Sequence, residues 1–301
     1  MYIKFVPHNE IDFAAYDRCI EQSSFGTVYA MSWYLNAVNS AWNLLILDDY
    51  RYVMPLPFKR KFGIPYSFQP PFCQQLGLFS CREITGELLQ DFLSAIPQRF
   101  YIVQLNSGNN FSEKNKIFGE VNIYLNYTLN LSAEYEKIKS RFHKNFKRNI
   151  KRAEAFSLSY NENIDIKTWQ TFTEQYAENR PIKKMMPVFL NLFDAVEKNA
   201  KAEIVSVKND TGETVACAIF MLWNNRAYYI VPVSSQEAKE KGAMSFLLNE
   251  WIKRHAQTPL VLDFEGSSAP NVARFYQSVG ANEEYYTAVK SNFMHRLFNS
   301  K

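Results

Sequence analysis

Two carboxylates and a tyrosine lie near one another late in the sequence, and their types suit acid–base chemistry. Asp263 and Glu265 end an apolar run, and Tyr276 follows after a turn of small residues. Residues two apart on a strand share a face, so both carboxylates are expected to point into one space. A carboxylate can take a proton from an amine, and a tyrosine can protonate a leaving group.

These groups suit the transfer of an acyl group to an amine. That reaction needs a deprotonated amine, a stabilised tetrahedral oxyanion and a protonated leaving group. Asp263 or Glu265 would receive the amine proton, directly or through water, or would hold a cationic acceptor. The sequence equally allows simpler roles, in which Tyr276 packs as an aromatic ring and Glu265 and Ser267 cap a helix.

A strand and a short helix must position these groups. The apolar run over 260–264 is typical of a central strand that is buried on both faces. Phe275 and Val279 fall on one face of a helix predicted over 270–280, which Gly280 ends. The polar groups would then lie at the carboxyl end of a central strand, where open α/β sheets bind ligands.

The residues before this strand predict an antiparallel meander and a long helix. Three strands are expected within 202–233, and Asn224 and Asn225 form a two-residue turn between the last two. Apolar residues at helical spacing over 244–255 indicate an amphipathic helix. Two more strands are expected after the short helix, the last of them over 293–298.

The net charge of +4 is concentrated in one segment. Residues 137–152 contain eight Lys or Arg and no acid, whereas acidic side chains outnumber basic ones in the rest of the chain. A helix is expected here, docked by a stripe of apolar residues at helical spacing: Ile138, Phe142, Phe146 and Ile150. It would present cations, among them Lys147, Arg148 and Lys151, to a nucleotide phosphate, a tRNA backbone or an anionic membrane.

The first half of the chain shows a looser version of the same order of elements. Helices are expected over 31–38 and 84–93, and strands over 43–47, 52–57, 100–105 and 121–131. Similar element order in both halves predicts two related domains, 1–131 and 132–301.

Composition predicts a well-packed globular protein. Hydrophobic residues make up 47% and aromatic residues 16% of the 301 residues, which argues against disorder. No apolar run approaches the ~20 residues of a membrane helix, and no secretory signal is recognisable. The spacing of the four cysteines supports neither a zinc site nor a disulfide framework. A cytoplasmic protein without a metal is expected.

Several motifs resemble the GNAT acyltransferase superfamily, and within it the tandem-GNAT Fem-like family. The helix over 270–280 carries Asn271, Ala273, Tyr276 and Gly280 in a GNAT-like arrangement. The basic segment Lys147-Arg148-Asn149-Ile150-Lys151-Arg152-Ala153 is similar to the R-R-N-I-x-K-A core of Fem proteins. Two segments of the first half resemble the family's N-terminal domain: Met31-Ser32-Trp33-Tyr34-Leu35 and Pro70-Pro71-Phe72-Cys73-Gln74-Gln75-Leu76-Gly77-Leu78.

The resemblance implies an α/β (α+β) fold of tandem GNAT-like domains, each a mixed, mostly antiparallel sheet flanked by helices. It also implies acyl-CoA, such as acetyl-CoA, as the donor, with Tyr276 protonating the departing thiolate. The GNAT phosphate loop, R/Q-x-x-G-x-G/A, corresponds to Lys239-Glu240-Lys241-Gly242-Ala243-Met244. The expected coenzyme contacts are Gln236, Lys239, Lys241, Gly242, Ala243 and Asn271.

The expected function is transfer of an acyl group from acyl-CoA to an amine by direct attack, in the second domain. The acceptor would be a small molecule or a cell-envelope precursor, and Arg180 would clamp its carboxylate. Two alternatives stay open. One is an aminoacyl-tRNA-dependent Fem-type transferase that acts on a cell-wall precursor, and the other is a non-catalytic binding module with a degenerate coenzyme site.

Overall fold

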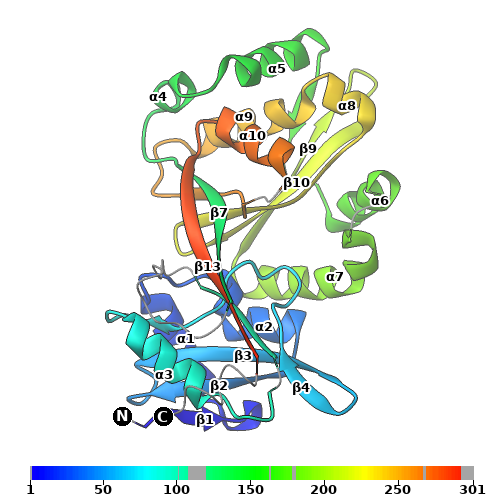
Figure 1. The fold of residues 1–301 in the computed structure, drawn as a ribbon. Coiled ribbons are helices and arrows are strands. Elements are labelled where there is room, and N and C mark those ends of the chain that lie inside the picture. Colours follow the sequence, from blue (N-terminus) through cyan, green and yellow to red (C-terminus); the bar gives the residue numbers. More distant parts are fainter. Residues whose placement is uncertain are drawn as a thin grey trace. The chain divides into compact units, whose positions relative to one another are not determined.

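The computed structural model describes residues 2–100, 102–107, 120–162, 164–177, 181–266 and 269–292. The chain forms two compact units (Figure 1). Unit 1 comprises residues 1–124 and 285–301, and unit 2 comprises residues 125–284. The sequence placed the boundary near residue 131 and assigned every later residue to the second domain, whereas the structure returns the last strand to unit 1.

Unit 1 is built on an antiparallel sheet in the order β1-β2-β3-β4, with β5 pairing with β3. The strands are β1 (Lys4–Val6), β2 (Trp42–Leu47), β3 (Tyr52–Lys61), β4 (Ile64–Ser67) and β5 (Phe79–Ser80). The helices are η1 (His8–Glu10), α1 (Phe13–Gln22), η2 (Val28–Ala30), α2 (Ser32–Val38) and α3 (Gly86–Ala95). Alternating side chains of β2 and β3 pack against α3, so one apolar core holds the sheet and this helix together.

Most of the last strand that the structure describes also belongs to unit 1. β13 (Asn282–Asn292) pairs antiparallel with β6 (Ile102–Ser107). Val289 of β13 is 2% exposed and packs in the same core as Leu45 and Phe92. β7 (Glu120–Asn130) and β13 each include residues of both units.

Unit 2 is built on strands in the order β7-β12-β11-β10-β9-β8. They are β8 (Ser159–Asn161), β9 (Lys201–Lys208), β10 (Thr214–Trp223), β11 (Arg226–Ser234) and β12 (Val261–Asp263), beside β7. All neighbours are antiparallel except β11 and β12, which run parallel. The predicted meander is therefore present, and Asn224 and Asn225 take the left-handed conformation of its tight turn.

Helices cover both faces of this sheet (Figure 1). They are α4 (Tyr135–Ser140), α5 (Lys144–Ala155), α6 (Ile166–Tyr176), α7 (Ile182–Asn199), α8 (Gln236–Glu240), α9 (Ala243–His255) and α10 (Pro270–Ser278). α5, α9 and α10 share one apolar core with the sheet, whereas α6 packs on β10 and β11 and α7 on β9. The predicted α/β class is confirmed.

Two predicted elements differ in the structure or lie outside it. The basic segment is not one helix, because the chain turns between α4 and α5. There the backbone N–H of His143 donates to the Ser278 carbonyl at 2.9 Å, which anchors the turn to the end of α10. The four residues of the apolar stripe are nonetheless all buried. The strand predicted over 293–298 lies outside the described residues.

Candidate active site

A cavity of about 560 Å³ lies beside the carboxyl half of strand β11. β11 pairs with β12 only from Arg226 to Tyr228, opposite Val261 to Asp263, in the described part of the chain. Beyond this point β11 contains a bulge, with Val231 at φ 43° and a register shift against β10. A bulge bends its strand, so the carboxyl half of β11 turns away from the line of β12.

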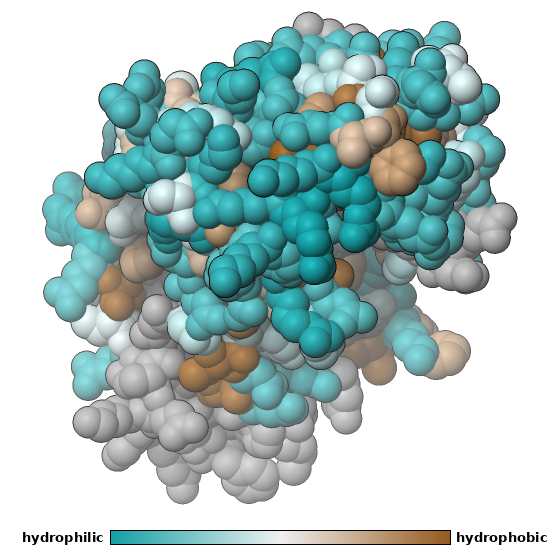
Figure 2. All heavy atoms as spheres, turned by 90° about the horizontal axis from the view of Figure 1, so that it is seen from above, coloured by the Kyte–Doolittle hydropathy of each residue, from teal (hydrophilic) through white to brown (hydrophobic). Residues whose placement is uncertain are grey.

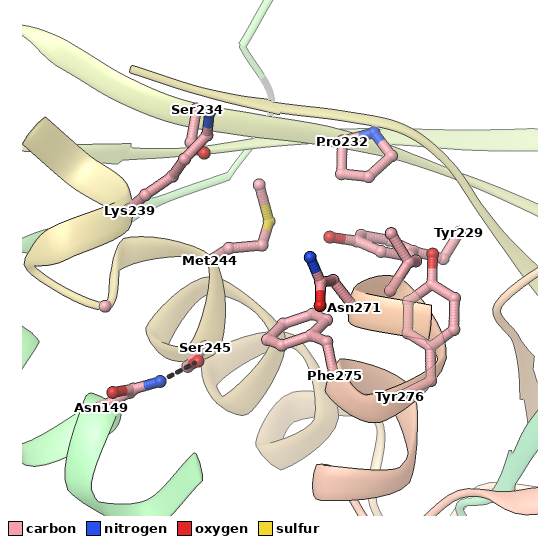
Figure 3. A pocket seen from close by; sticks show the side chains of 12 residues that line it. Asn149, Tyr229, Pro232, Ser234, Lys239, Met244, Ser245, Asn271, Phe275 and Tyr276 are labelled. Carbon is pink, nitrogen blue, oxygen red and sulfur yellow. Dashed lines mark hydrogen bonds between the residues drawn. The ribbon is translucent and has the colours of Figure 1, made fainter. Parts of the chain in front are cut away.

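Strand β11 and the helices α5, α8, α9 and α10 line this cavity (Figure 3). The lining side chains and backbone belong to Asn149, Tyr229, Pro232, Ser234, Lys239, Gly242, Met244, Ser245, Asn271, Val272, Phe275 and Tyr276. Most of this surface is apolar, while hydroxyl and amide groups occupy a few positions. Such a lining suits an elongated ligand with an apolar stem and polar ends.

The amino terminus of α9 borders the cavity and depends on Gly242. This glycine is the N-cap at φ 80°, a conformation that side chains other than glycine rarely adopt. A Cβ atom here would lie 2.4 Å from the Asn149 carbonyl oxygen, so only glycine lets α5 approach this closely. The first-turn N–H groups of a helix lack partners within it and favour anions.

The basic helix α5 lies beside this amino terminus of α9. It packs against α9 in the core of unit 2, and Asn149 lies at the contact. Arg152 donates to the Glu240 carbonyl at 2.9 Å, while Arg148 and Lys151 are exposed. Lys147 is half-buried and bonds to the Ser140 carbonyl at 3.2 Å. The face uppermost in Figure 1, which carries α4, α5 and α8, is largely hydrophilic (Figure 2).

Tyr276 lines the cavity, as does a second tyrosine that the sequence did not single out. Tyr276 is 6% exposed and stacks on Phe264 at 4.6 Å between ring centroids. Tyr229 is 2% exposed, 6.5 Å away. Figure 3 shows the Tyr229 hydroxyl pointing toward Met244 and Asn271, and the Tyr276 hydroxyl pointing toward β11. A phenol that reaches a bound group can protonate it, but the Tyr229 hydroxyl is itself fully buried, which leaves Tyr276 as the candidate.

Asp263 does not line this cavity. It is 1% exposed, and its two oxygens accept hydrogen bonds from Asn126 at 3.0 Å, from the Glu265 backbone N–H at 2.8 Å and from Arg226 at 2.5 Å. Burial opposes the charge of Arg226, but Asp263 and Glu284 more than offset it and raise the pKa of the guanidinium. Asp263 thus fixes the pairing of β7, β11 and β12 through a buried ion pair.

Glu265 does not share a strand face with Asp263. β12 ends at Asp263, and Glu265 has φ 56°, so the two-residue alternation of a strand does not extend to it. The turn forms because the carboxylate of Asp263 accepts the Glu265 N–H, an arrangement that short acidic side chains favour. Glu265 is half-buried just after the strand, outside the cavity lining.

The structure brings together only part of the expected coenzyme contacts. Lys239, Gly242 and Asn271 line the cavity. Ala243 is the buried first residue of α9. The exposed Gln236 accepts a hydrogen bond from Lys239 at 3.3 Å, and Lys241 pairs with Glu237 at 2.5 Å. Arg180 lies outside the described residues.

Several lining residues were not predicted as site residues, among them Tyr229, Asn149, Ser245 and Met244. The first follows Tyr228 in an ordinary meander strand, and only the bulge at Val231 marks that strand as unusual. In the sequence, Asn149 belongs to a basic motif, although an amide side chain at a contact between helices often positions the residues around it. Its side chain lies 3.5 Å from the Ser245 hydroxyl. Figure 3 shows the Met244 side chain projecting into the middle of the cavity.

A second, polar cavity of about 370 Å³ lies at the β8 edge of the sheet. Its charges pair with one another: Glu203 accepts from Lys201 at 2.6 Å and from Trp251 at 2.8 Å, and contacts His255 at 3.2 Å. Burial disfavours the charged form of Glu203, but hydrogen bonds from His255, Lys201 and Trp251 outweigh it and lower the pKa to about 2.

Within the described ranges, no three His, Cys, Asp or Glu side chains gather in a group that would hold a metal ion. No helix of this part of the chain combines the length and apolar character that crossing a membrane requires.

Comparison with known protein families identifies the domain that contains the cavity. Residues 140–281 match the family model described as an acetyltransferase (GNAT) domain. The matched segment includes β11, α9, β12 and α10, the elements around the cavity. Unit 2 therefore contains a GNAT acetyltransferase domain, and the predicted enzyme class, an acyltransferase, is confirmed. No curated protein matches the chain.

Solved structures resemble the chain over nearly its whole length. FemX has a TM-score of 0.64 at 13% identity, covering 95% of this chain and 97% of that one. The C-terminal domain of a putative lysylphosphatidylglycerol synthetase from Agrobacterium fabrum has a TM-score of 0.57 at 11% identity. The match covers 95% of this chain and 94% of that one. A tandem GNAT protein from the clavulanic acid biosynthesis pathway has a TM-score of 0.55 at 9% identity. The match covers 97% of this chain and 99% of that one. At such identities the similarity shows the fold, which is tandem GNAT-like as predicted.

Proposed function

We propose that this acyltransferase moves an acyl group from acyl-CoA to an amine by direct attack, without a covalent enzyme intermediate. The cavity beside the carboxyl half of β11 carries this proposal, since its mostly apolar lining suits the stem of an elongated thioester between an anion-favouring helix terminus and the phenol of Tyr276.

The phosphates of the donor would lie at the amino terminus of α9. Lys239 replaces the first arginine or glutamine of the usual loop, and the adjacent α5 supplies further cations through Arg148 and Lys151. Met244 stands where the loop usually has a small residue and projects into the cavity. The donor would therefore bind beside the methionine, with α5 compensating for the altered loop.

The chemical roles follow from the positions of the side chains. Tyr276 would protonate the leaving thiolate. Glu265 would contact the acceptor amine, because the oxygens of Asp263 are already occupied by hydrogen bonds. We propose a cell-envelope precursor or another amine as the acceptor. The similarity to a putative lysylphosphatidylglycerol synthetase, whose name denotes a lipid product, supports an envelope molecule.

Calorimetric titration of the full chain with acetyl-CoA, longer acyl-CoAs and free coenzyme A tests the donor. Binding of the coenzyme should weaken in Lys239→Gln. The control Lys167→Gln removes an equal charge at an exposed position of α6 and should bind normally. The absence of measurable heat and of any thermal shift at high micromolar ligand would contradict an acyl-CoA donor.

The exposed cations of α5 favour a second candidate, an aminoacyl-tRNA donor. Phosphate contacts by such a helix give an affinity that falls steeply with salt. Filter binding of charged tRNA at two salt concentrations distinguishes the donors. Salt-dependent tRNA binding that Arg148→Gln weakens, without a response to acyl-CoA, would favour this alternative.

A further inference from the structure

The β3–β4 hairpin of unit 1 ends in an exposed apolar tip. We define the hairpin tip as residues 59–64, Lys-Arg-Lys-Phe-Gly-Ile. Phe62 is 92% exposed and Ile64 is 54% exposed. The two strands pair up to Lys61 and Ile64, so Phe62 and Gly63 alone form the turn. Figure 1 shows this hairpin extending outward from its sheet.

The turn holds Phe62 in a conformation that a bulky side chain rarely adopts. Phe62 has φ 51° and Gly63 has φ 80°, which are the signs of a type I′ turn. Asparagine or aspartate before glycine is the sequence that this turn favours, and a large residue there is an outlier. An exposed aromatic ring in a strained turn buries little surface on folding, so it points to a role in contact with another molecule.

The same tip is strongly basic. Lys59, Arg60 and Lys61 are exposed, and no acidic residue occurs between Arg51 and Arg82 in the sequence. None of the three takes part in an ion pair within the described ranges. Instead they lie over aromatic rings, such as Lys59 over Phe68 at 4.4 Å.

We propose that the hairpin tip docks the protein on an anionic lipid bilayer. Phe62 and Ile64 enter the boundary between headgroups and acyl chains, and the three cations contact anionic headgroups. A convex tip with two apolar side chains offers too little area for a stable protein partner, which typically needs about 1,000 Å² or more of buried surface. It does suit a fluid surface that closes around it.

Flotation of the full chain with vesicles tests this role. The protein should float with vesicles of phosphatidylcholine and phosphatidylglycerol, and much less with phosphatidylcholine alone or at high salt. Phe62→Asn should weaken binding about tenfold. This change places the favoured Asn-Gly pair in the turn, so the melting temperature should not fall. Tyr2→Asn is the control, because Tyr2 is 84% exposed elsewhere and should be neutral.

The charge component has its own pair of variants. Lys59→Gln with Lys61→Gln should reduce binding to anionic vesicles about tenfold or more. Lys167→Gln with Lys198→Gln removes the same charge from exposed sites of unit 2 and should leave it unchanged. The proposal is overturned if the wild type does not float with anionic vesicles, or if Phe62→Asn floats equally well. It is also overturned if heparin abolishes vesicle binding while the Phe62 substitution has no effect on it. Acyl-CoA binding that persists in Phe62→Asn keeps this outcome separate from the proposed reaction.

Discussion

Tyr276 and Tyr229 both line the cavity, but the Tyr229 hydroxyl is fully buried, and a departing thiolate needs only one proton. We expect Tyr276→Phe to lower kcat about 100-fold with little change in KM, since a general acid acts in the transition state. Thiol release with a panel of amines measures this. Tyr229→Phe is the matched control in the same cavity, and if it alone lost activity, the acid would be Tyr229.

Asp263 is expected to matter for stability before it matters for chemistry. Asp263→Asn preserves the shape of the side chain but leaves Arg226 without its buried counter-charge. The free energy of unfolding should fall by about 2–4 kcal/mol. Asp210→Asn, at an exposed turn, should change it by less than about 0.5 kcal/mol. Equal denaturant midpoints for the two variants would contradict a structural role for this ion pair.

Glu203 is expected to make stability depend on acidity. Its pKa in the folded chain, about 2, lies below the ordinary value of 4.5, so its contribution is complete above pH 4.5 and is lost as the pH falls toward 2. The side chain is only 13% exposed, and the contribution should be about 2–3 kcal/mol. Chemical denaturation from about pH 5 to about pH 3 should show a smaller loss in Glu203→Gln than in the wild type.

At the scale of elements, Gly242 lets the basic helix meet the cavity. Gly242→Ala adds backbone strain and a clash with the Asn149 carbonyl, and α5 must move to relieve it. We expect a loss of about 2–4 kcal/mol in unfolding free energy. Gly212→Ala is the matched control, because Gly212 has φ 83° and no atom within 4 Å of the added Cβ. It should lose only about 1 kcal/mol from strain. If Gly242→Ala and Gly212→Ala lost equal unfolding free energy, α5 could move away from α9 at no cost, contrary to this prediction.

Local patterns predicted the elements of unit 2 well. The meander and α9 followed from turn residues and apolar periodicity, which act within a few residues. The break between α4 and α5 was missed because Gly280 and Ser278, far along the chain, hold the turn. Asp263 was expected beside the acceptor since nothing in its neighbourhood reveals Asn126 and Arg226 as partners. The cavity itself depends on where β11 leaves β12, a pairing that single-strand patterns do not encode.

At the scale of the whole molecule, the last strand is expected to stabilise the first unit. Val289→Ala removes apolar contacts from the core of unit 1, which residues from β2, β3 and α3 form. Hydrogen exchange should show faster opening of β2 and β3, with little change in β9 and β10 of unit 2. A loss of about 1–3 kcal/mol is expected. Protection that changed only in unit 2 would contradict this assignment.

The return of β13 to unit 1 also has a consequence during protein synthesis. Residues 125–284 leave the ribosome before the later residues of β13, so unit 2 has nearly all its strands while the sheet pairing of β6 is still missing. Nascent unit 1 therefore carries an open strand edge for most of translation, although it is made first. Such edges invite pairing with other chains. Chaperones that bind this nascent chain should accordingly protect β6 until β13 has been made.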